Sequence, residues 1–203
     1  MEDPKALVRR GYDLVSRAYR ADDADDAYTP WLDELERRVR PPSRVLDLGC
    51  GCGVPVARRL SGRYDVTGVD FSEEQISRAR QLVPSATFRC ADIATLSFPD
   101  ETFGAVVALY VLIHLPLEEQ PLMLRNVRRW LRPGGLLLAT VGYRAWTGIE
   151  TDWLGVKGAD MWWSHADAAT YKRWLEEAGL RVEIEAFVPE GTGGHTLFLA
   201  APP

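Results

Sequence analysis

A glycine-rich turn after a short apolar strand is the feature that most constrains this 203-residue chain. Residues 45–48 are apolar except for Asp47, and three glycines follow at alternate positions, Gly49, Gly51 and Gly53. Glycine lets the backbone turn with positive φ and lets a ligand approach to contact distance. The turn therefore predicts a nucleotide-like ligand at the end of this strand. Because the Asp47 carboxylate would repel a pyrophosphate, the pattern favours a positively charged ligand over a dinucleotide.

Two further predicted strands also end in carboxylates. Residues 64–70 end in Asp70, and residues 87–92 end in Asp92, which is followed by Ile93. The sequence separation between the glycine turn and Asp70 is that at which an acidic side chain can accept hydrogen bonds from both ribose hydroxyls. Asp92 can accept a hydrogen bond from the exocyclic amine of a nucleobase, and Ile93 can pack against the same nucleobase. Three consecutive strands thus place acids at the edge where open parallel sheets bind ligands.

Five elements, taken in order, resemble the class I S-adenosylmethionine-dependent methyltransferases, in the small bacterial type that consists of the methyltransferase domain alone. They are residues 45–53, 69–70, 91–93, 110–116 and 131–139. The resemblance implies S-adenosylmethionine as cofactor, S-adenosylhomocysteine as product, and a ligand whose sulfonium and ammonium groups suit Asp47. The predicted cofactor contacts are Asp47, Gly49, Cys50, Gly51, Gly53, Asp70, Phe71, Asp92, Ile93, Leu109, Tyr110 and Tyr19. One departure is Gly104, which replaces the acid that commonly follows the phenylalanine of the fourth strand.

The alternation of predicted helices and strands favours an α/β fold. We expect a Rossmann-like, doubly wound sheet of seven strands, mostly parallel, with an antiparallel last strand formed by a hairpin over 181–187 and 195–200. Ser72 is the predicted N-cap of a helix over 72–82. We divide a single domain over 1–203 into a helical cap (1–42), a cofactor-binding core (43–141), a substrate lid (142–166) and a final helix with hairpin (167–203). Two helices, 4–20 and 31–39, form the cap, with an acidic break at 22–26.

Composition favours a compact enzyme acting on a small molecule. The chain is 46% hydrophobic and 26% charged, and its net charge of -5 gives no broad basic field for nucleic acid or an anionic membrane. It contains no apolar run of about 20 residues, and its first residues lack the order of a signal peptide, so we expect a cytoplasmic location. The three cysteines, Cys50, Cys52 and Cys90, fall short of a metal site, and we predict no metal. The sequence leaves the oligomeric state open.

The segment over 142–164 is irregular in pattern and rich in aromatic residues, which suits a substrate lid. The predicted substrate contacts are Tyr143, Trp146, Trp162, Trp163 and Glu190. In the alternative, these tryptophans only complete a small core. The first helix is a second candidate wall, where Tyr12, Tyr19 or Arg20 could reach the methionine carboxylate of the cofactor. In the alternative, the aromatic residues of this helix only pack on its buried face and do not contact the cofactor.

Three histidines are the candidates for a general base, in the order His165, His195 and His114. His165 follows two tryptophans, but Ser164 is also a plausible N-cap that would leave His165 exposed in the first turn of a helix. Glu190 could orient His195 across the final hairpin, unless both are solvated there. His114 follows the fourth strand, and the alternative for this residue is that it only braces the loop.

The predicted reaction is an in-line transfer of a methyl group to an oxygen, nitrogen or carbon nucleophile of a small, apolar or aromatic metabolite. Alignment and removal of a proton from the nucleophile are the main tasks left to the protein. Two alternatives remain at this point. One is a nicotinamide-dependent oxidoreductase on the same kind of sheet, and the other is a non-methylating protein that binds S-adenosylmethionine, such as a cyclase.

Overall fold

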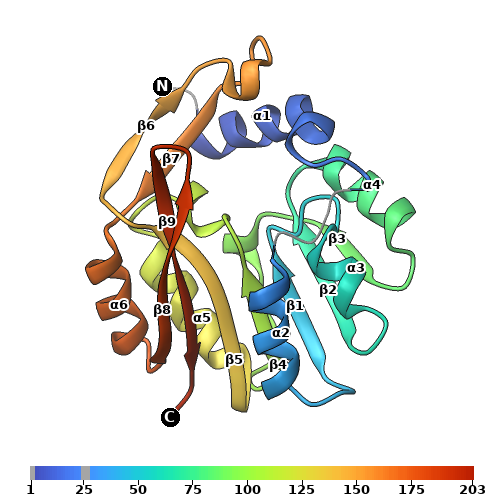
Figure 1. Cartoon of the computed structure of the whole chain (residues 1–203), viewed down its shortest axis with the longest axis vertical. Helices are drawn as coiled ribbons and strands as arrows, with labels where there is room; N and C mark the ends of the chain where they lie inside the picture. Colours follow the sequence, from blue (N-terminus) through green and yellow to red (C-terminus); the bar gives the residue numbers. More distant parts are fainter. Residues whose placement is uncertain (1–2, 24–27) are drawn as a thin grey trace.

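The fold is a seven-stranded sheet between two layers of helices, with one helix and a hairpin across its upper edge (Figure 1). The computed structural model describes residues 3–23 and 28–203. In spatial order the strands are β3 (Thr87–Cys90), β2 (Asp65–Asp70), β1 (Arg44–Leu48), β4 (Phe103–Ala108), β5 (Leu131–Gly142), β9 (Gly193–Ala201) and β8 (Arg181–Glu190). Strands β1 to β5 pair in parallel, and β9 pairs antiparallel with both neighbours. The predicted fold class is confirmed, including the antiparallel last strand.

Each face of the sheet carries its own hydrophobic core. On one face α5 (Gln120–Trp130) and α6 (Ala168–Glu177) pack on alternate strand residues such as Leu46 and Leu48. On the other face α2 (Thr29–Arg38), α3 (Val56–Leu60) and α4 (Glu73–Leu82) pack on Val45 and Val66. Period-two alternation along buried strands produces this division, since successive side chains point to opposite faces. Asp47 has the parity of Val45, so its carboxylate belongs to the α2–α3–α4 side.

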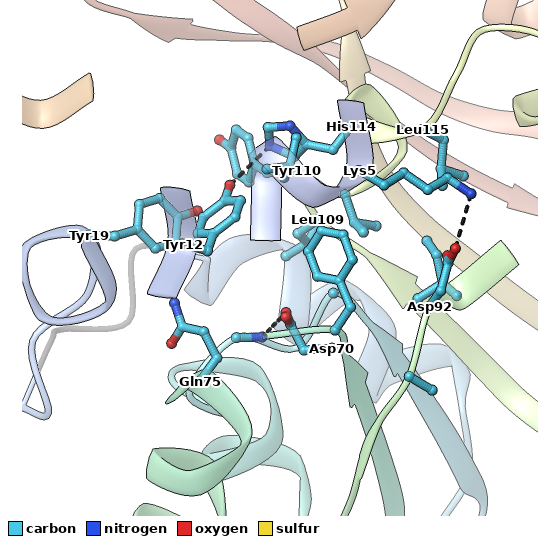
Figure 2. Close-up of a pocket in the computed structure, with 17 residues that line it drawn as sticks. Lys5, Tyr12, Tyr19, Asp70, Gln75, Asp92, Leu109, Tyr110, His114 and Leu115 are labelled. Carbon is cyan, nitrogen blue, oxygen red and sulfur yellow. Dashed lines mark hydrogen bonds and ion pairs between the residues drawn. The ribbon is translucent and has the colours of Figure 1, made fainter. Parts of the chain in front are cut away.

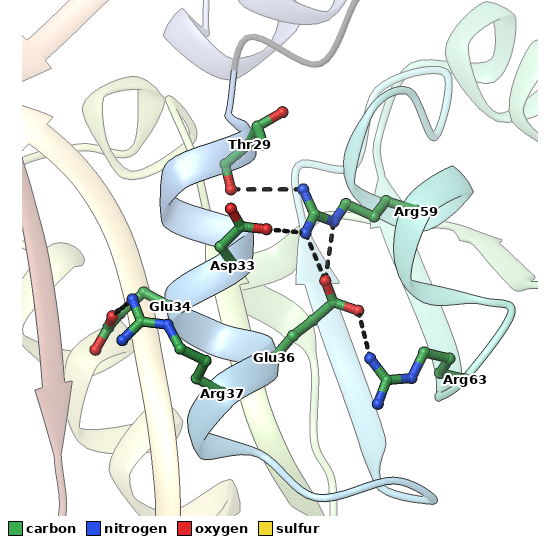
Figure 3. Close-up of polar contacts among 7 residues, drawn as sticks. All are labelled: Thr29, Asp33, Glu34, Glu36, Arg37, Arg59 and Arg63. Carbon is green, nitrogen blue, oxygen red and sulfur yellow. Dashed lines mark hydrogen bonds and ion pairs between the residues drawn. The ribbon is translucent and has the colours of Figure 1, made fainter.

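Local sequence signals fix where several helices begin. Ser72 caps α4 as predicted, because its Oγ accepts from the Gln75 backbone N–H at 3.1 Å. Charged side chains then join α2 to α3, where Arg59 donates to Glu36 at 2.6 Å and also contacts Asp33, while Arg63 reaches Glu36 at 3.2 Å (Figure 3). This network holds the second half of the predicted cap against the glycine-loop helix. The acidic break predicted at 22–26 lies partly outside the described residues.

Helix α1 (Pro4–Tyr19) lies across the carboxyl ends of the strands and is anchored to α4 by one buried arginine. The Arg78 side chain, only 4% exposed, donates to the backbone oxygens of Ser16 and Arg20 at 2.6 and 2.7 Å and pairs with Asp22 at 2.6 Å. The last carbonyls of a helix have no partner within the helix, so this guanidinium satisfies groups that would otherwise need water. The end of α1 that carries Tyr19 and Arg20 is therefore fixed in position.

The predicted lid is more regular than its sequence pattern suggests. Strands β6 (Trp146–Glu150) and β7 (Met161–His165) form an antiparallel hairpin whose tip holds the short helix η3 (Trp153–Gly155). The prediction that this segment is irregular was wrong, since residues 146–150 pair with residues 161–165 in a two-stranded ladder in which Gly148 lies opposite Trp163. The predicted N-cap role of Ser164 was also wrong: Ser164 is buried in β7, and Asp167 caps α6 through the Thr170 backbone N–H. Strand β4 ends at Ala108, and the short helix η2 (Leu112–His114) comes after it.

The helices of the described residues lack the length and apolar character needed to cross a membrane.

A buried glutamine ties the hairpin to the core. Gln120 is fully buried, and its side-chain amide donates to the backbone oxygens of Leu115 and Ser164 at 2.8 and 2.7 Å. Its own oxygen accepts from the Tyr171 hydroxyl at 2.5 Å. The base of the hairpin, the loop after β4 and helix α6 therefore share one hydrogen-bonded junction.

We expect Tyr171→Phe to lower the free energy of unfolding by about 1–3 kcal/mol, because it leaves the buried Gln120 oxygen without a donor. Urea unfolding followed by circular dichroism measures the change. Tyr143→Phe is the matched control, since Tyr143 is half-buried at the surface and such changes stay within about 0.5 kcal/mol. An equal effect in the two variants would contradict a structural role for the junction.

Candidate functional site

The carboxyl edge of β1, β2 and β4 borders a cavity of about 600 Å³, roofed by α1 (Figure 2). Ten of the predicted residues line it: Tyr19, Gly49, Gly51, Asp70, Phe71, Asp92, Ile93, Leu109, Tyr110 and His114. Asp47 and Cys50 line an adjoining hollow of about 420 Å³, which shares Tyr19, Gly49, Gly51 and Leu109 with the first. The structure thus brings nearly all the predicted cofactor contacts together.

The glycine turn has the backbone conformation that the sequence requires. Gly49, Gly51 and Gly53 have φ of +66°, +53° and +78°, a region that other residues rarely adopt. A Cβ on Gly49 would lie 2.5 Å from the Val111 side chain, so the turn also needs glycine for space. Gly53 instead faces Phe88, whose ring a Cβ would meet at 3.0 Å, and does not line either hollow. Its part is to close the turn rather than to border the cavity.

Asp70 is held by backbone donors at the floor of the cavity. Its two carboxylate oxygens accept from the N–H groups of Gly51 at 3.0 Å and Ser72 at 2.9 Å. Burial nevertheless raises the pKa of Asp70 to about 6, and the two N–H donors oppose that shift only in part. The carboxylate is therefore oriented toward the cavity edge and can accept from further donors.

Asp47 carries a buried oxygen that lacks a partner. The residue is 3% exposed, and Oδ2 accepts no hydrogen bond from the described residues. Burial raises the pKa of Asp47 well above its usual range, and the nearby Asp70 raises it further. An isolated buried carboxylate is costly unless a positive group pairs with it. Its position in the second hollow therefore fits a ligand that brings a cation.

Arg20 supplies the opposite charge in the same hollow. Its guanidinium lies over the rings of Tyr19 and Tyr28, at 5.5 and 5.3 Å from the centroids, and donates to the Tyr28 hydroxyl at 2.7 Å. No carboxylate of the described residues pairs with it. Arg20 and Asp47 together can hold a ligand that carries both a carboxylate and an ammonium group. This arrangement fits the methionine part of S-adenosylmethionine.

A lysine that no sequence motif singles out lies beside Asp92. Asp92 Oδ1 accepts from the Ala94 backbone N–H at 2.9 Å, and Oδ2 accepts from Lys5 Nζ at 3.0 Å (Figure 2). Lys5 also pairs with Glu119 at 2.5 Å. The first turn of α1 is thereby joined to the loop of Asp92 and Ile93, which is predicted to contact the nucleobase of the ligand. The contact spans 87 residues of sequence, so no local pattern could reveal it.

His114 and Tyr12 form a hydrogen-bonded pair in the cavity wall. His114 Nδ1 lies 2.9 Å from the backbone oxygen of Trp162, and Nε2 lies 3.0 Å from the Tyr12 hydroxyl (Figure 2). Burial lowers the pKa of His114 to about 4, so the ring is neutral at pH 7. Because a carbonyl only accepts, Nδ1 carries the proton and Nε2 accepts from Tyr12. The neutral pair therefore presents a histidine nitrogen that can receive a proton through Tyr12.

The other two histidines lie outside the cavity lining. His195 Nδ1 lies 2.9 Å from Glu190 Oε2, and the His195 ring centroid lies 4.9 Å from that of Tyr110. The close approach of His195 lowers the pKa of Glu190. His165 Nδ1 lies 2.7 Å from the backbone oxygen of Arg144 at the base of the hairpin. Of the three candidates, His114 is the one that lines this cavity.

The lid aromatics divide into two groups. The Trp163 ring lies 4.6 Å from His114, and the Trp162 backbone orients the same histidine. Tyr143 instead packs on Phe187, and Trp146 is 42% exposed beside His165. Trp153, Lys5 and Gln75 were not among the predicted contacts, although Trp153 lies in the aromatic segment that the sequence marks out. Gln75 lines both hollows, and its Oε1 accepts from Ser16 Oγ at 3.0 Å.

Comparison with known proteins agrees with this geometry. Residues 45–135 match a family described as a methyltransferase domain. The chain is 38% identical over 122 residues to 27-O-demethylrifamycin SV methyltransferase of Amycolatopsis mediterranei, covering 56% of this chain and 44% of that protein. Its fold matches magnesium protoporphyrin IX methyltransferase of Synechocystis PCC 6803, solved with bound S-adenosylmethionine, with a TM-score of 0.75, 18% identity and coverage of 100% and 99%. Residues 45–135 thus match a methyltransferase domain, and the chain is similar in sequence and fold to the class I S-adenosylmethionine-dependent methyltransferases.

The cofactor of this methyltransferase family is S-adenosylmethionine, and neighbouring structures hold it or S-adenosylhomocysteine. The fold is also shared with the 4+2 cyclase SpnF, with a TM-score of 0.74, 21% identity and coverage of 100% and 97%. Of three curated relatives that the chain matches, it spans only 31%, 44% and 65% of their length. These relatives therefore identify the methyltransferase domain, whereas activity and substrate are matters for proposal.

We expect the affinity for S-adenosylhomocysteine to fall about tenfold between pH 7.5 and pH 5. Burial raises the pKa of Asp70 to about 6, and only the ionised carboxylate can accept from two ribose hydroxyls. Binding must then release a proton below about pH 6, which weakens it as the pH falls. Titration calorimetry in buffers of different ionisation enthalpy measures both the dissociation constant and the released proton.

Asp92→Asn is the control, since it should weaken binding and keep the pH dependence. An affinity that stays constant from pH 7.5 to pH 5 would show that Asp70 is not the ribose acceptor.

Proposed function

We propose that this chain transfers a methyl group from S-adenosylmethionine to an oxygen, nitrogen or carbon nucleophile of a small, apolar or aromatic metabolite. The observation that carries the proposal is the Tyr12–His114 hydrogen bond in the wall of the cavity that also contains Asp70 and Asp92. A proton-accepting pair beside a cofactor-sized cavity is what removal of a proton from a nucleophile requires.

Each part of the cofactor has a matching group. Asp92 and Ile93 are placed for the adenine, and Asp70 for the ribose hydroxyls. Asp47 and Arg20 are placed for the ammonium and carboxylate groups of methionine. The glycine turn lies between these groups, and because glycine has no side chain, a ligand can approach its backbone closely. These assignments follow the family pattern and the charges in the two hollows.

S-adenosylmethionine supplies an activated methyl carbon, so the protein has only to align the acceptor and accept its proton. Tyr12 can take the proton of the acceptor while it passes its own to His114 Nε2. The His114 ring then carries the positive charge that the sulfonium loses on transfer, so the net charge of the pocket stays constant. Trp162 holds Nδ1 through its backbone oxygen and keeps Nε2 directed at Tyr12.

The aromatic lid supports an apolar or aromatic acceptor. The Trp153 ring packs on Tyr12, with centroids 5.5 Å apart, and the Trp163 ring packs on His114, with centroids 4.6 Å apart. Relatives of the chain act by name on phosphatidylethanolamine, on a sterol carbon and on a 27-O position of a rifamycin. They include nitrogen, carbon and oxygen acceptors and so favour no single atom. Nucleic acid is a less suitable partner at a net charge of -5.

The test is to incubate the protein with S-adenosylmethionine and a panel of small phenols, catechols, aryl amines and aliphatic amines. Mass spectrometry then identifies any methylated product. A non-methylating cyclase would bind S-adenosylhomocysteine and yield no methylated product from any class of acceptor. An oxidoreductase would bind a nicotinamide cofactor instead.

With an acceptor in hand, we expect Tyr12→Phe and His114→Asn each to lower kcat about 100-fold or more, the usual contribution of acid–base catalysis. His114→Asn keeps a donor for the Trp162 oxygen and removes the acceptor nitrogen. Affinity for S-adenosylhomocysteine should change less than about threefold, since neither hydrogen bond holds the groups placed for the cofactor.

Tyr64→Phe is the matched control, because its buried hydroxyl donates to Val39 at 2.8 Å, away from the cavity. A larger loss of kcat in His195→Asn than in Tyr12→Phe would move the proton-accepting role to His195 and Glu190.

A further inference from the structure

A tryptophan at the tip of the hairpin fills an aromatic slot beside the proton-accepting pair. The Trp153 ring centroid lies 5.5 Å from Tyr12, 5.4 Å from Tyr19 and 5.6 Å from Trp163. The interplanar angles are 79°, 39° and 81°, so two walls meet it edge to face and the third is tilted. Such arrangements are favourable for a planar ring. The walls of the slot come from two elements, α1 and β7, and the flat ring that they hold comes from a third, η3.

The backbone on both sides of Trp153 is strained. Asp152 and Leu154 have φ of 51° and 56°, in the left-handed region that non-glycine residues seldom occupy. Leu154 is also 50% exposed, so its own packing offsets little of that strain. Strained conformations of this kind persist only where surrounding contacts hold them, and they concentrate at functional sites. The packing of the Trp153 ring on Tyr12, Tyr19 and Trp163 joins this tip to α1 and β7.

The rest of the tip contains two glycines with positive φ and open space around them. Gly155 and Gly158 have φ of +72° and +80°, and a Cβ on either would meet nothing within 4 Å. These glycines therefore serve backbone conformation and not close packing. The tip contacts itself through Trp153 N–H to Ala159 oxygen at 2.8 Å and Gly158 N–H to Asp152 Oδ1 at 2.7 Å. Both hydrogen bonds lie within the tip and do not involve the indole, so they would remain if the Trp153 ring left the slot.

The slot shares its walls with the site. Tyr12 and Tyr19 line the cofactor cavity, and the Tyr12 hydroxyl contacts His114. Trp163, the third wall, packs on His114 with the ring centroids 4.6 Å apart. A ring held in this slot would therefore lie next to the group that accepts the proton.

We propose that this slot is the acceptor subsite, that it takes a flat aromatic ring, and that Trp153 is the residue that determines which rings enter. The acceptor ring takes the place of the indole against Tyr12, Tyr19 and Trp163 while the glycine-bearing tip moves outward. The inference rests on the proposed methyl transfer and narrows its acceptor to planar aromatic molecules. A permanent wall of the pocket is the competing role for Trp153.

The test compares Trp153→Ala with the unchanged protein, each saturated with S-adenosylhomocysteine, using 2-naphthol and its saturated analogue 2-decalol as probes. Calorimetry should give a dissociation constant for 2-naphthol at least tenfold lower in Trp153→Ala, because the slot is open without displacement of the indole. The 2-decalol should bind at least tenfold more weakly than 2-naphthol to the variant. Ile149→Ala, an exposed residue of the same hairpin, should behave as the unchanged protein does.

Trp153→Phe provides a second measurement, since a smaller ring opens the slot in part and should lower the 2-naphthol dissociation constant about threefold. Normal binding of S-adenosylhomocysteine with no gain for 2-naphthol in either variant would overturn the acceptor slot and leave the methyltransferase proposal standing. Equal gains for 2-naphthol and 2-decalol would overturn the planar selectivity. Loss of S-adenosylhomocysteine binding by the unchanged protein would instead defeat the proposed function itself.

Discussion

The burial of Asp47 without a partner is the constraint on which the rest of the site depends. A carboxylate removed from water costs several kcal/mol unless a positive group offsets it. The chain keeps it at the end of a central strand, where burial raises the pKa of Asp47 well above its usual range. The glycines that follow leave room for a ligand to reach this oxygen. A cationic ligand would restore the ionised form, so the same feature that destabilises the empty fold favours binding.

Helix α1 converts this edge into an enclosed site, and its attachments lie at both ends. Arg78 fixes the last turn to α4, which places Tyr19 and Arg20 over the glycine turn. Lys5 fixes the first turn to Asp92 and Glu119. Tyr12 lies between them and reaches His114. Because one rigid element carries all four side chains, the charge-binding groups and the proton-accepting pair keep a fixed relation to each other.

The sheet and the cofactor edge could be predicted because their signals are local. A glycine turn, a strand that ends in Asp70, and a Ser72 cap each depend on neighbouring residues, and each was found where expected. The strand predicted over 87–92 was too long: β3 ends at Cys90, and Asp92 caps the short helix η1 (Ile93–Thr95). The Tyr12–His114 pair and the Lys5–Asp92 pair could not be predicted, because they join positions 102 and 87 residues apart. His165 was misplaced for a related reason. Ser164 resembles an N-cap in sequence, yet ladder pairing with Thr147 and burial draw it into β7.

The low pKa of His114 is consistent with a role in proton transfer, although it makes the ring a weak base in the free protein. Burial penalises the imidazolium, which is why the pKa falls to about 4. A bound sulfonium would place a positive charge near His114. Because that charge would repel an imidazolium, the ring would stay neutral until the methyl group is transferred. Transfer removes that charge from the sulfonium, so protonation of His114 becomes more favourable at the moment when the acceptor loses its proton. Under the proposed function, the neutral, hydrogen-bonded histidine would thus be coupled by electrostatics to methyl transfer, with Tyr12 as the connection.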